Sequence, residues 1–278
     1  MSKKSKRARN PKPFDSSAIK APEKKLGICV ATPTLDGRLH AGCVATVMQL
    51  QKLCIEEGIS FTWKVLAGNS ILPLARNELT KQFLETKATH LFMIDSDIQV
   101  DPRHILYLLG HDRMLSALPC SKREVLWDRL GEFINAYPNT SLELYPALIA
   151  EGNFSTEEEV FNVDEFGFAK VLKVGTGAMM VKREVFEKIM ASNPDNYFST
   201  SNGKLYQFFS YSVDEETKTQ YGEDYTFCNT WRKLGGEVDL LVAAKTKHHG
   251  QLAIEFNWKG IAETITEFMA AKEQANAG

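Results

Sequence analysis

The chain has 278 residues, of which 44% are hydrophobic, and its 33 basic and 35 acidic residues leave a net charge of -2. This length and apolar content predict one globular domain with an elaborated end. The small net charge argues against a uniformly basic nucleic-acid coat, although charge can be unevenly distributed along a chain.

Basic residues are concentrated in the first 24 residues of the chain. Six basic residues fall in the first dozen positions, with no acid and almost nothing apolar: Lys3, Lys4, Lys6, Arg7, Arg9 and Lys12. We therefore predict a disordered basic tail over 1–24, either solvated or docked on phosphates. The tail lacks the apolar stretch of a secretory signal, and no later run approaches the ~18 apolar residues of a membrane span. We expect a cytoplasmic protein with no membrane span.

The five cysteines form no CxxC pair. This pattern favours buried free thiols in a reducing compartment over a disulfide framework or a zinc site. No chemistry is assigned to them.

Strand and helix patterns alternate from residue 26 onward. Hydrophobic runs predict strands at 26–31, 60–66, 90–94, 115–119, 169–174, 179–181 and 238–243. Helical spacing and end signals predict helices at 41–57, 72–87, 102–110, 183–190, 225–234 and 261–275. The alternation predicts an α/β fold with a mostly parallel central sheet and helices on both faces. One domain over 25–255 is expected, with 256–278 as a C-terminal helix that packs on it or extends from it.

Polar residues gather where the predicted strands end. In such sheets ligands bind outside the carboxyl ends of the strands. Asp95-Ser96-Asp97 follows directly after the apolar run 90–94. Carboxylates there need a compensating partner, and hard oxygen ligands suit Mn²⁺ or Mg²⁺, which can bridge a diphosphate. Taken alone, this three-residue pattern also arises by chance.

A second acidic pair, Glu223-Asp224, stands at a predicted helix start. Free backbone N–H groups and the helix dipole favour an anion there. One of the two acids can be explained as an N-cap, which leaves the other available as a general base.

His248 and His249 follow the last predicted strand and precede a glycine. An imidazole at this position can reach an ion at the same sheet edge, although histidine more often has a core or surface role. Acidic or imidazole groups at three strand ends favour a shared site.

The ordered motifs resemble a family. Val30-Ala31-Thr32-Pro33-Thr34, Ala75-Arg76-Asn77, the DSD after its strand, Gly175-Thr176-Gly177, Gly222-Glu223-Asp224 and His248-His249-Gly250 together resemble GT-A glycosyltransferases, especially small ones encoded by viruses and phages. The resemblance covers about 25–250. It implies a Rossmann-like GT-A sheet with a small acceptor-side elaboration, within the poorly periodic segment 122–165. If the chain is viral, the host cytoplasm is the expected location.

The resemblance also implies roles for individual residues. On the donor side, Thr32, Pro33 and Thr34 would border the nucleoside, Arg76 would approach the base or diphosphate, Asp95 and Ser96 would contact the donor, and Gly175, Thr176 and Gly177 would lie close to the donor sugar. Asp97 would bind the metal, with Asp95 assisting, and His248 would be a further metal ligand, with His249 in reserve. Asp224, with Glu223 beside it, would serve as base if the reaction inverts. Arg76 can alternatively be a surface charge and Gly175 an ordinary turn. Lys122, Arg123 and Trp127 are weaker acceptor-side candidates, and the two cations are equally explained as a solvated pair.

Three classes of function compete. The first is a metal-dependent transferase that moves a sugar from a nucleotide-diphosphate donor, with a UDP-sugar favoured, onto a hydroxyl. The second is another phosphate-handling enzyme such as a nucleotidyltransferase; the absence of a GxxxxGK[ST] loop counts against it. The third is a silent sugar-nucleotide-binding module.

The acceptor and the oligomeric state stay open at this stage. One candidate acceptor is a glycan or glycoprotein, with aromatic side chains stacking on sugar faces. The other is DNA carrying a hydroxymethylated base, suggested by the basic tail and by the resemblance to phage enzymes; such a base would have to leave the duplex.

Overall fold

The structure is a computed structural model that describes residues 26–141, 144–157, 162–201, 203–250 and 254–276. The predicted tail over 1–24 lies outside this part of the chain. No helix among the described residues is both long and apolar enough to cross a membrane.

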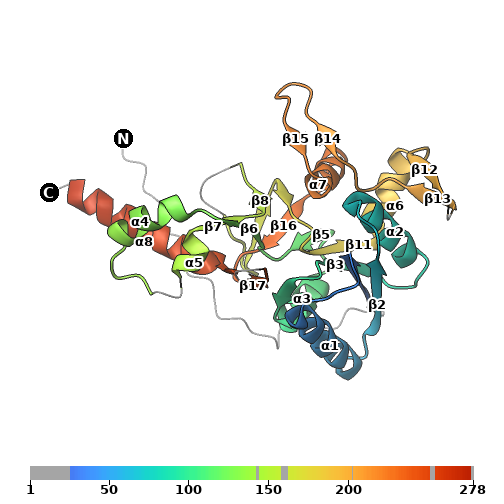
Figure 1. Ribbon diagram of the computed structural model, residues 1–278, viewed down its shortest axis with the longest axis horizontal. Helices are drawn as coiled ribbons and strands as arrows, with labels where there is room; N and C mark the ends of the chain where they lie inside the picture. Colours follow the sequence, from blue (N-terminus) through green and yellow to red (C-terminus); the bar gives the residue numbers. More distant parts are fainter. Residues whose placement is uncertain (1–25, 142–143, 158–161, 202, 251–253, 277–278) are drawn as a thin grey trace.

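A seven-stranded sheet forms the centre of the described chain, in the order β2-β1-β3-β11-β5-β16-β9 (Figure 1). Its strands are β1 (Gly27–Thr34), β2 (Ser60–Ala67), β3 (His90–Ile94), β5 (Leu115–Ala117), β9 (Phe168–Val171), β11 (Ala178–Lys182) and β16 (Val238–Leu241). The pairs β1–β2, β1–β3 and β5–β16 are parallel, whereas β11 and β9 run antiparallel to their neighbours. Five of the seven strands share one direction, which confirms the predicted mostly parallel α/β sheet.

Helices cover both faces of this sheet. They are α1 (Ala41–Glu56), α2 (Leu72–Leu84), α3 (Pro102–His111), α6 (Arg183–Ser192) and α7 (Glu223–Lys233). One hydrophobic core contains side chains of α2, α6 and α7, and a second contains those of α1 and α3. Successive residues of β3 alternate between the two cores, as the period of two in a strand requires. The uninterrupted apolar run at 90–94 is therefore a strand buried on both faces.

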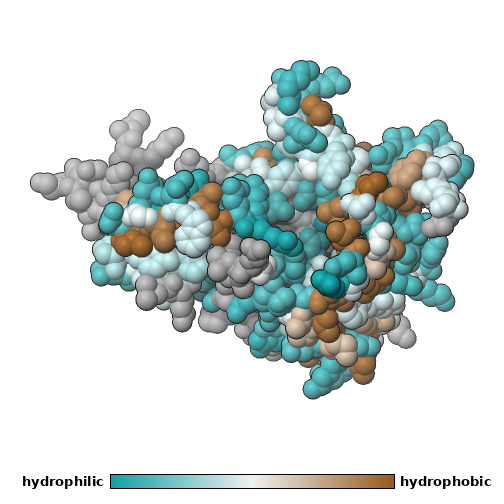
Figure 2. Space-filling model, viewed as in Figure 1, coloured by the Kyte–Doolittle hydropathy of each residue, from teal (hydrophilic) through white to brown (hydrophobic). Residues whose placement is uncertain are grey.

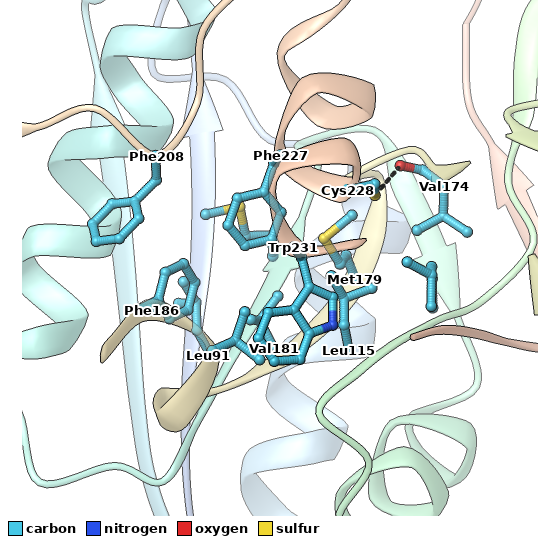
Figure 3. Packing of buried hydrophobic residues seen from close by; sticks show 14 of the residues in the cluster. Leu91, Leu115, Val174, Met179, Val181, Phe186, Phe208, Phe227, Cys228 and Trp231 are labelled. Atoms are coloured by element: carbon cyan, nitrogen blue, oxygen red, sulfur yellow. Dashed lines mark hydrogen bonds between the residues drawn. The ribbon is translucent and has the colours of Figure 1, made fainter. Parts of the chain in front are cut away.

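Helix α7 is held against the sheet by large side chains. Phe227 and Trp231 project from it into the core beside Phe186 and Met179 (Figure 3). The Cys228 thiol lies 3.6 Å from the Val174 carbonyl oxygen. Full burial of an aromatic side chain such as Phe227 stabilises the folded state by roughly 1.5–3 kcal/mol. This packing fixes the N-terminus of α7, where the acidic pair stands.

Strand β1 is longer than predicted. Thr32, Pro33 and Thr34 were expected to form a loop, but they continue the strand and pair in register with Val65, Leu66 and Ala67 of β2. Proline is compatible with this ladder because its missing N–H removes only one bond. The predicted strand at 169–174 is likewise divided, into β9 and the short β10 (Lys173–Val174).

A second, three-stranded sheet follows the DSD segment and was not predicted. Strand β4 (Ile98–Val100) pairs antiparallel with β17 (Lys245–His248), which pairs in turn with β18 (Ile254–Asn257). His248 is the register partner of Ile98. A three-residue strand is too short for its alternation to be recognised in the sequence.

The segment 121–155, which follows β5 and is called the excursion below, packs at the other end of the molecule from β2 (Figure 1). It contains β6 (Ser121–Val125), α4 (Trp127–Ala136), α5 (Tyr145–Leu148), β7 (Ala150–Gly152) and β8 (Phe154–Ser155). With α8 (Trp258–Asn276) it forms a third small core that includes Tyr145, Phe256 and Ile261. Figure 2 shows hydrophobic residues at this end of the surface; the exposed ones on α4 and α8 are Trp127, Ile134, Ile265 and Met269.

The remaining short strands lie beside α6 and α7. They are β12 (Tyr197–Thr200), β13 (Gly203–Tyr206), β14 (Ser212–Val213) and β15 (Gln220–Tyr221), paired as two hairpins.

Candidate functional site

The DSD segment is a tight turn between β3 and β4. The Asp95 N–H donates to the Gly177 carbonyl at 3.1 Å, and the Asp95 carbonyl accepts from the Ile98 N–H at 3.1 Å. The Ser96 carbonyl accepts from the His40 N–H at 2.8 Å. These backbone bonds fix the directions of the two carboxylates. Asp95 and Asp97 are therefore held at the edge of the sheet, as predicted, but they meet different partners.

Asp95 pairs with Arg76. The Arg76 Nη2 atom lies 3.1 Å from Asp95 Oδ1, and its Nε donates to Glu223 Oε1 at 3.0 Å. The Arg76 side chain is only 2% exposed, so the alternative of a surface charge on α2 is wrong. Burial alone would lower the pKa of Arg76, but Asp95 and Glu223 outweigh it and raise that pKa. One nitrogen, Nη1, has no hydrogen-bond partner among the described residues.

The acidic pair lies inside the first turn of α7, not before it. The N-cap is Gly222, which has no side chain to cap the helix, so the interpretation of one acid as N-cap is wrong. Glu223 is buried and neutralised by Arg76. Asp224 is only partly exposed, and burial, followed by repulsion from Glu223, raises its pKa. A carboxylate with a raised pKa is a stronger base than an ordinary one.

Asn153 links Asp224 to the glycine motif. Its Nδ2 atom lies 3.5 Å from Asp224 Oδ2, and the Gly175 N–H donates to the Asn153 carbonyl at 2.8 Å. A Cβ atom on Gly175 would lie 2.0 Å from Asn153 Nδ2. Gly175 thus has an observed role in letting Asn153 approach. Nothing in the sequence around Asn153 pointed to this residue.

A cavity of about 310 Å³ opens beside Asp224. Its walls come from the excursion, through Lys122 and Asn153, and from the β15–α7 junction, through Gln220, Tyr221 and Tyr225. Lys122 is held there by an ion pair with Glu151 at 2.7 Å. The cavity therefore combines a partly buried carboxylate with both polar and aromatic walls.

Asp97 meets His248 and Arg123. Asp97 Oδ1 lies 3.4 Å from His248 Nε2, Arg123 Nη2 contacts Asp97 Oδ2, and Arg123 Nε donates to His248 Nε2 at 3.0 Å. His248 Nδ1 lies 2.8 Å from the Ser121 carbonyl, which places the hydrogen on Nδ1 and the lone pair on Nε2. Burial, more than the nearby Arg123, lowers the pKa of His248 and favours the neutral ring.

The Asp97–His248 arrangement fits two ligands of one divalent cation. Two ligands at right angles around Mg²⁺ are roughly 3 Å apart, close to the 3.4 Å observed. A carbonyl on the far ring nitrogen is the usual support for a ligating imidazole. In the described part of the chain, no three His, Cys, Asp or Glu side chains are grouped to hold a metal. Substrate phosphates and water commonly complete such sites.

His249 points elsewhere. Its Nε2 lies 2.8 Å from Gln99 Oε1, and its ring stacks on His40 at 3.6 Å between centroids. Its backbone N–H donates to the Asp97 carbonyl at 2.8 Å. His248, the first choice from the sequence, is the imidazole that contacts the Asp97 carboxylate.

The remaining site residues predicted from the sequence have surroundings of their own. The Thr32 hydroxyl is fully buried and accepts from Trp63 Nε1 at 3.1 Å, while the Thr34 hydroxyl donates to the Arg38 carbonyl at 2.8 Å. The buried Thr176 hydroxyl has no hydrogen-bond partner among the described residues. Trp127 is 59% exposed on α4.

No protein-family model and no curated protein matches the chain. Among solved structures it is similar to a glycosyltransferase involved in glycosylation of the major capsid of PBCV-1, at 13% identity and a TM-score of 0.28, over 60% of this chain and 67% of that one. It is also similar to the inositol-1-phosphate CTP transferase of T. maritima, at 11% identity and a TM-score of 0.36, over 87% and 94%. A third is HddC of Yersinia pseudotuberculosis, solved with GMP-PN, at 10% identity and a TM-score of 0.29, over 75% and 97%. Identities and TM-scores this low do not identify a function for this chain.

Proposed function

We propose that this chain is a GT-A-type glycosyltransferase that moves a sugar from a nucleotide-diphosphate donor to a hydroxyl acceptor, with Mn²⁺ or Mg²⁺ at Asp97 and His248. The observation that supports this most directly is the convergence of Arg76, Asp95, Asp97, Glu223 and Asp224 at one sheet edge. These residues come from α2, the β3–β4 turn and α7.

The charges divide into two groups. On one side Arg76 pairs with both Asp95 and Glu223, so that three buried or partly buried charges form one network. On the other side Asp97 and His248 present a carboxylate oxygen and an imidazole lone pair to a cation. The first group is a rigid support, and the second is the ligand set.

A divalent cation at this position would supply charge stabilisation for the leaving nucleoside diphosphate. The protein's own contribution is to orient its ligands: the Ser121 carbonyl sets the His248 tautomer, and the backbone bonds of the turn aim Asp97. Asp95, held by Arg76, would accept a hydrogen bond from a donor hydroxyl.

Asp224 is our candidate general base for an inverting transfer. Its raised pKa brings the carboxylate closer to the range in which a base is effective at neutral pH. The adjacent cavity of about 310 Å³ would hold the acceptor hydroxyl group. Its mixed polar and aromatic walls suit a sugar acceptor.

The test is hydrolysis of a panel of UDP-, GDP- and other nucleotide sugars with Mn²⁺, Mg²⁺ or EDTA. We expect slow metal-dependent release of the nucleoside diphosphate by the wild type and its loss in Asp97→Asn. Asp128→Asn, an exposed carboxylate on α4, is the matched control and should retain activity.

The competing functions give different results in the same assay. Release of pyrophosphate from a nucleoside triphosphate in the presence of a sugar phosphate would identify a nucleotidyltransferase instead. Binding of nucleotide sugars with no turnover under any condition would indicate a silent binding module.

A further inference from the structure

The cation site proposed above contains a positive charge supplied by the protein itself. The Arg123 guanidinium contacts Asp97 Oδ2 through Nη2 and donates from Nε to His248 Nε2 at 3.0 Å. These are the carboxylate and the lone pair that a metal would need. A lone pair that accepts from Arg123 cannot coordinate a metal at the same time.

Arg123 is built differently from the other arginine of the site. The side chain of Arg76 is 2% exposed and has two buried or partly buried carboxylate partners, whereas that of Arg123 is 63% exposed. An ion pair whose cation is mostly exposed to solvent contributes less to folding stability than a fully buried one. Arg123 can therefore leave its partners without disturbing the core.

The backbone around Arg123 is also irregular. Strand β6 pairs with β7 only at Ser121 and Val125, and the register shifts between these two positions. Irregularities of this kind redirect a side chain and leave intervening residues outside the ladder. Arg123 stands in the middle of the shifted segment. Ser121, which orients His248, stands at its anchored end, so the ligand stays in place if Arg123 moves.

We propose that Arg123 is a resident counter-cation that occupies the Asp97–His248 site in the free protein and is displaced when a divalent cation binds. Metal and guanidinium then exclude each other, and the apparent metal affinity equals the intrinsic affinity multiplied by the fraction of molecules in which Arg123 has left the site. The displaced guanidinium stays beside the ion and can bind a donor phosphate, because the planar guanidinium donates two parallel N–H hydrogen bonds to phosphate oxygens. This inference rests on the proposed function for the identity of the cation site.

The experiment measures binding of Mn²⁺ alone by electron paramagnetic resonance, without any nucleotide or sugar. Arg123→Ala should bind Mn²⁺ about tenfold more tightly than the wild type if Arg123 fills the site in about nine of ten molecules. The control is Lys122→Ala, which removes the neighbouring charge on β6 that pairs with Glu151 instead. Adding Asp97→Asn to Arg123→Ala should abolish the gain in Mn²⁺ affinity, which would show that the Mn²⁺ binds at this site.

A second measurement follows the guanidinium directly. In nitrogen-15 spectra, titration with Mg²⁺ should shift the Arg123 Nε–H resonance, while that of Arg76 should stay in place. Equal Mn²⁺ affinity of Arg123→Ala and Lys122→Ala would overturn the inference, since any gain would then be simple charge removal. Absence of Mn²⁺ binding in Arg123→Ala would overturn it too.

The fate of the proposed function is read separately. If nucleotide sugars are turned over in EDTA while no variant binds Mn²⁺, sugar transfer stands, but its proposed metal dependence and the displacement model both fail. If Arg123→Ala binds Mn²⁺ tightly but no nucleotide sugar is turned over, the displacement model stands and the proposed activity fails.

Discussion

Replacing Arg76 by methionine tests the central charge network. Methionine has a similar length and no charge, so Arg76→Met removes the cation while retaining much of the side-chain volume. Glu223 and Asp95, with side chains 8% and 31% exposed, then lose their shared partner. The change leaves a buried carboxylate without compensation.

The expected cost follows from that burial. Breaking a fully buried ion pair by removing one partner costs about 3–5 kcal/mol. Because Asp95 is about one-third exposed, water relieves part of its charge, and we place Arg76→Met near the lower limit, at about 3 kcal/mol. Adding Glu223→Gln removes the stranded charge, so the double variant should recover about 1–3 kcal/mol relative to additivity.

Urea unfolding at pH 7 measures these differences. The control is Arg232→Met, in which the lost partner is an exposed glutamate, Glu157, at 3.4 Å; it should cost less than about 1 kcal/mol. The reasoning is refuted if Arg76→Met and Arg232→Met cost the same, or if Glu223→Gln destabilises the Arg76→Met protein further.

Three further predictions concern single residues. Asp224→Asn should lower kcat about 10²-fold or more with little change in donor affinity; equal kcat values in steady-state assays would contradict the assignment. Because the folded protein holds the pKa of Asp224 above its ordinary value, the variant should also be more stable than wild type at neutral pH. This stability advantage shrinks as the pH falls through that pKa. Gly175→Ala places a Cβ 2.0 Å from Asn153 Nδ2 and should cost about 1–3 kcal/mol in urea unfolding; an unchanged midpoint would show that Asn153 is not held there. Burial lowers the pKa of His90 from 6.5 to about 4, so the unfolded chain binds the proton first and the free energy of unfolding should fall as the pH drops from about 6.5 to about 4. In acid denaturation, His90→Asn should make this fall in stability less steep. An equally steep fall in the variant would count against the burial argument.

Local patterns in the sequence were enough for most of the central fold. The apolar run at 90–94, the helical spacing at 41–57 and the capping signal at Asp101-Pro102 each predicted an element that the structure contains. They succeed because strand and helix periodicity depend on neighbouring residues. The class of fold, with a mostly parallel sheet covered on both faces, follows from the order of such elements.

The same patterns indicated which residue types gather at the sheet edge, but not how they pair. Arg76 and Glu223 are 147 positions apart, and Asp97 meets His248 only because the three-residue strand β4 pairs with β17. Pairings this distant depend on the tertiary fold and leave no periodic signal. The sequence left Arg76 open as a surface charge and one of the two acids Glu223 and Asp224 open as a helix cap; burial decided the first question and the position of the N-cap at Gly222 decided the second.

The sequence by itself thus determined the layered sheet and the supply of carboxylates, imidazoles and cations at its carboxyl edge. Only the tertiary structure decided which charge compensates which: Arg76 takes Asp95 and Glu223, Arg123 takes Asp97 and His248, and Asp224 keeps a raised pKa beside a cavity. The physical reason is that the elements form from local preferences, whereas a charge's partner and solvent exposure depend on which distant segments pack against it.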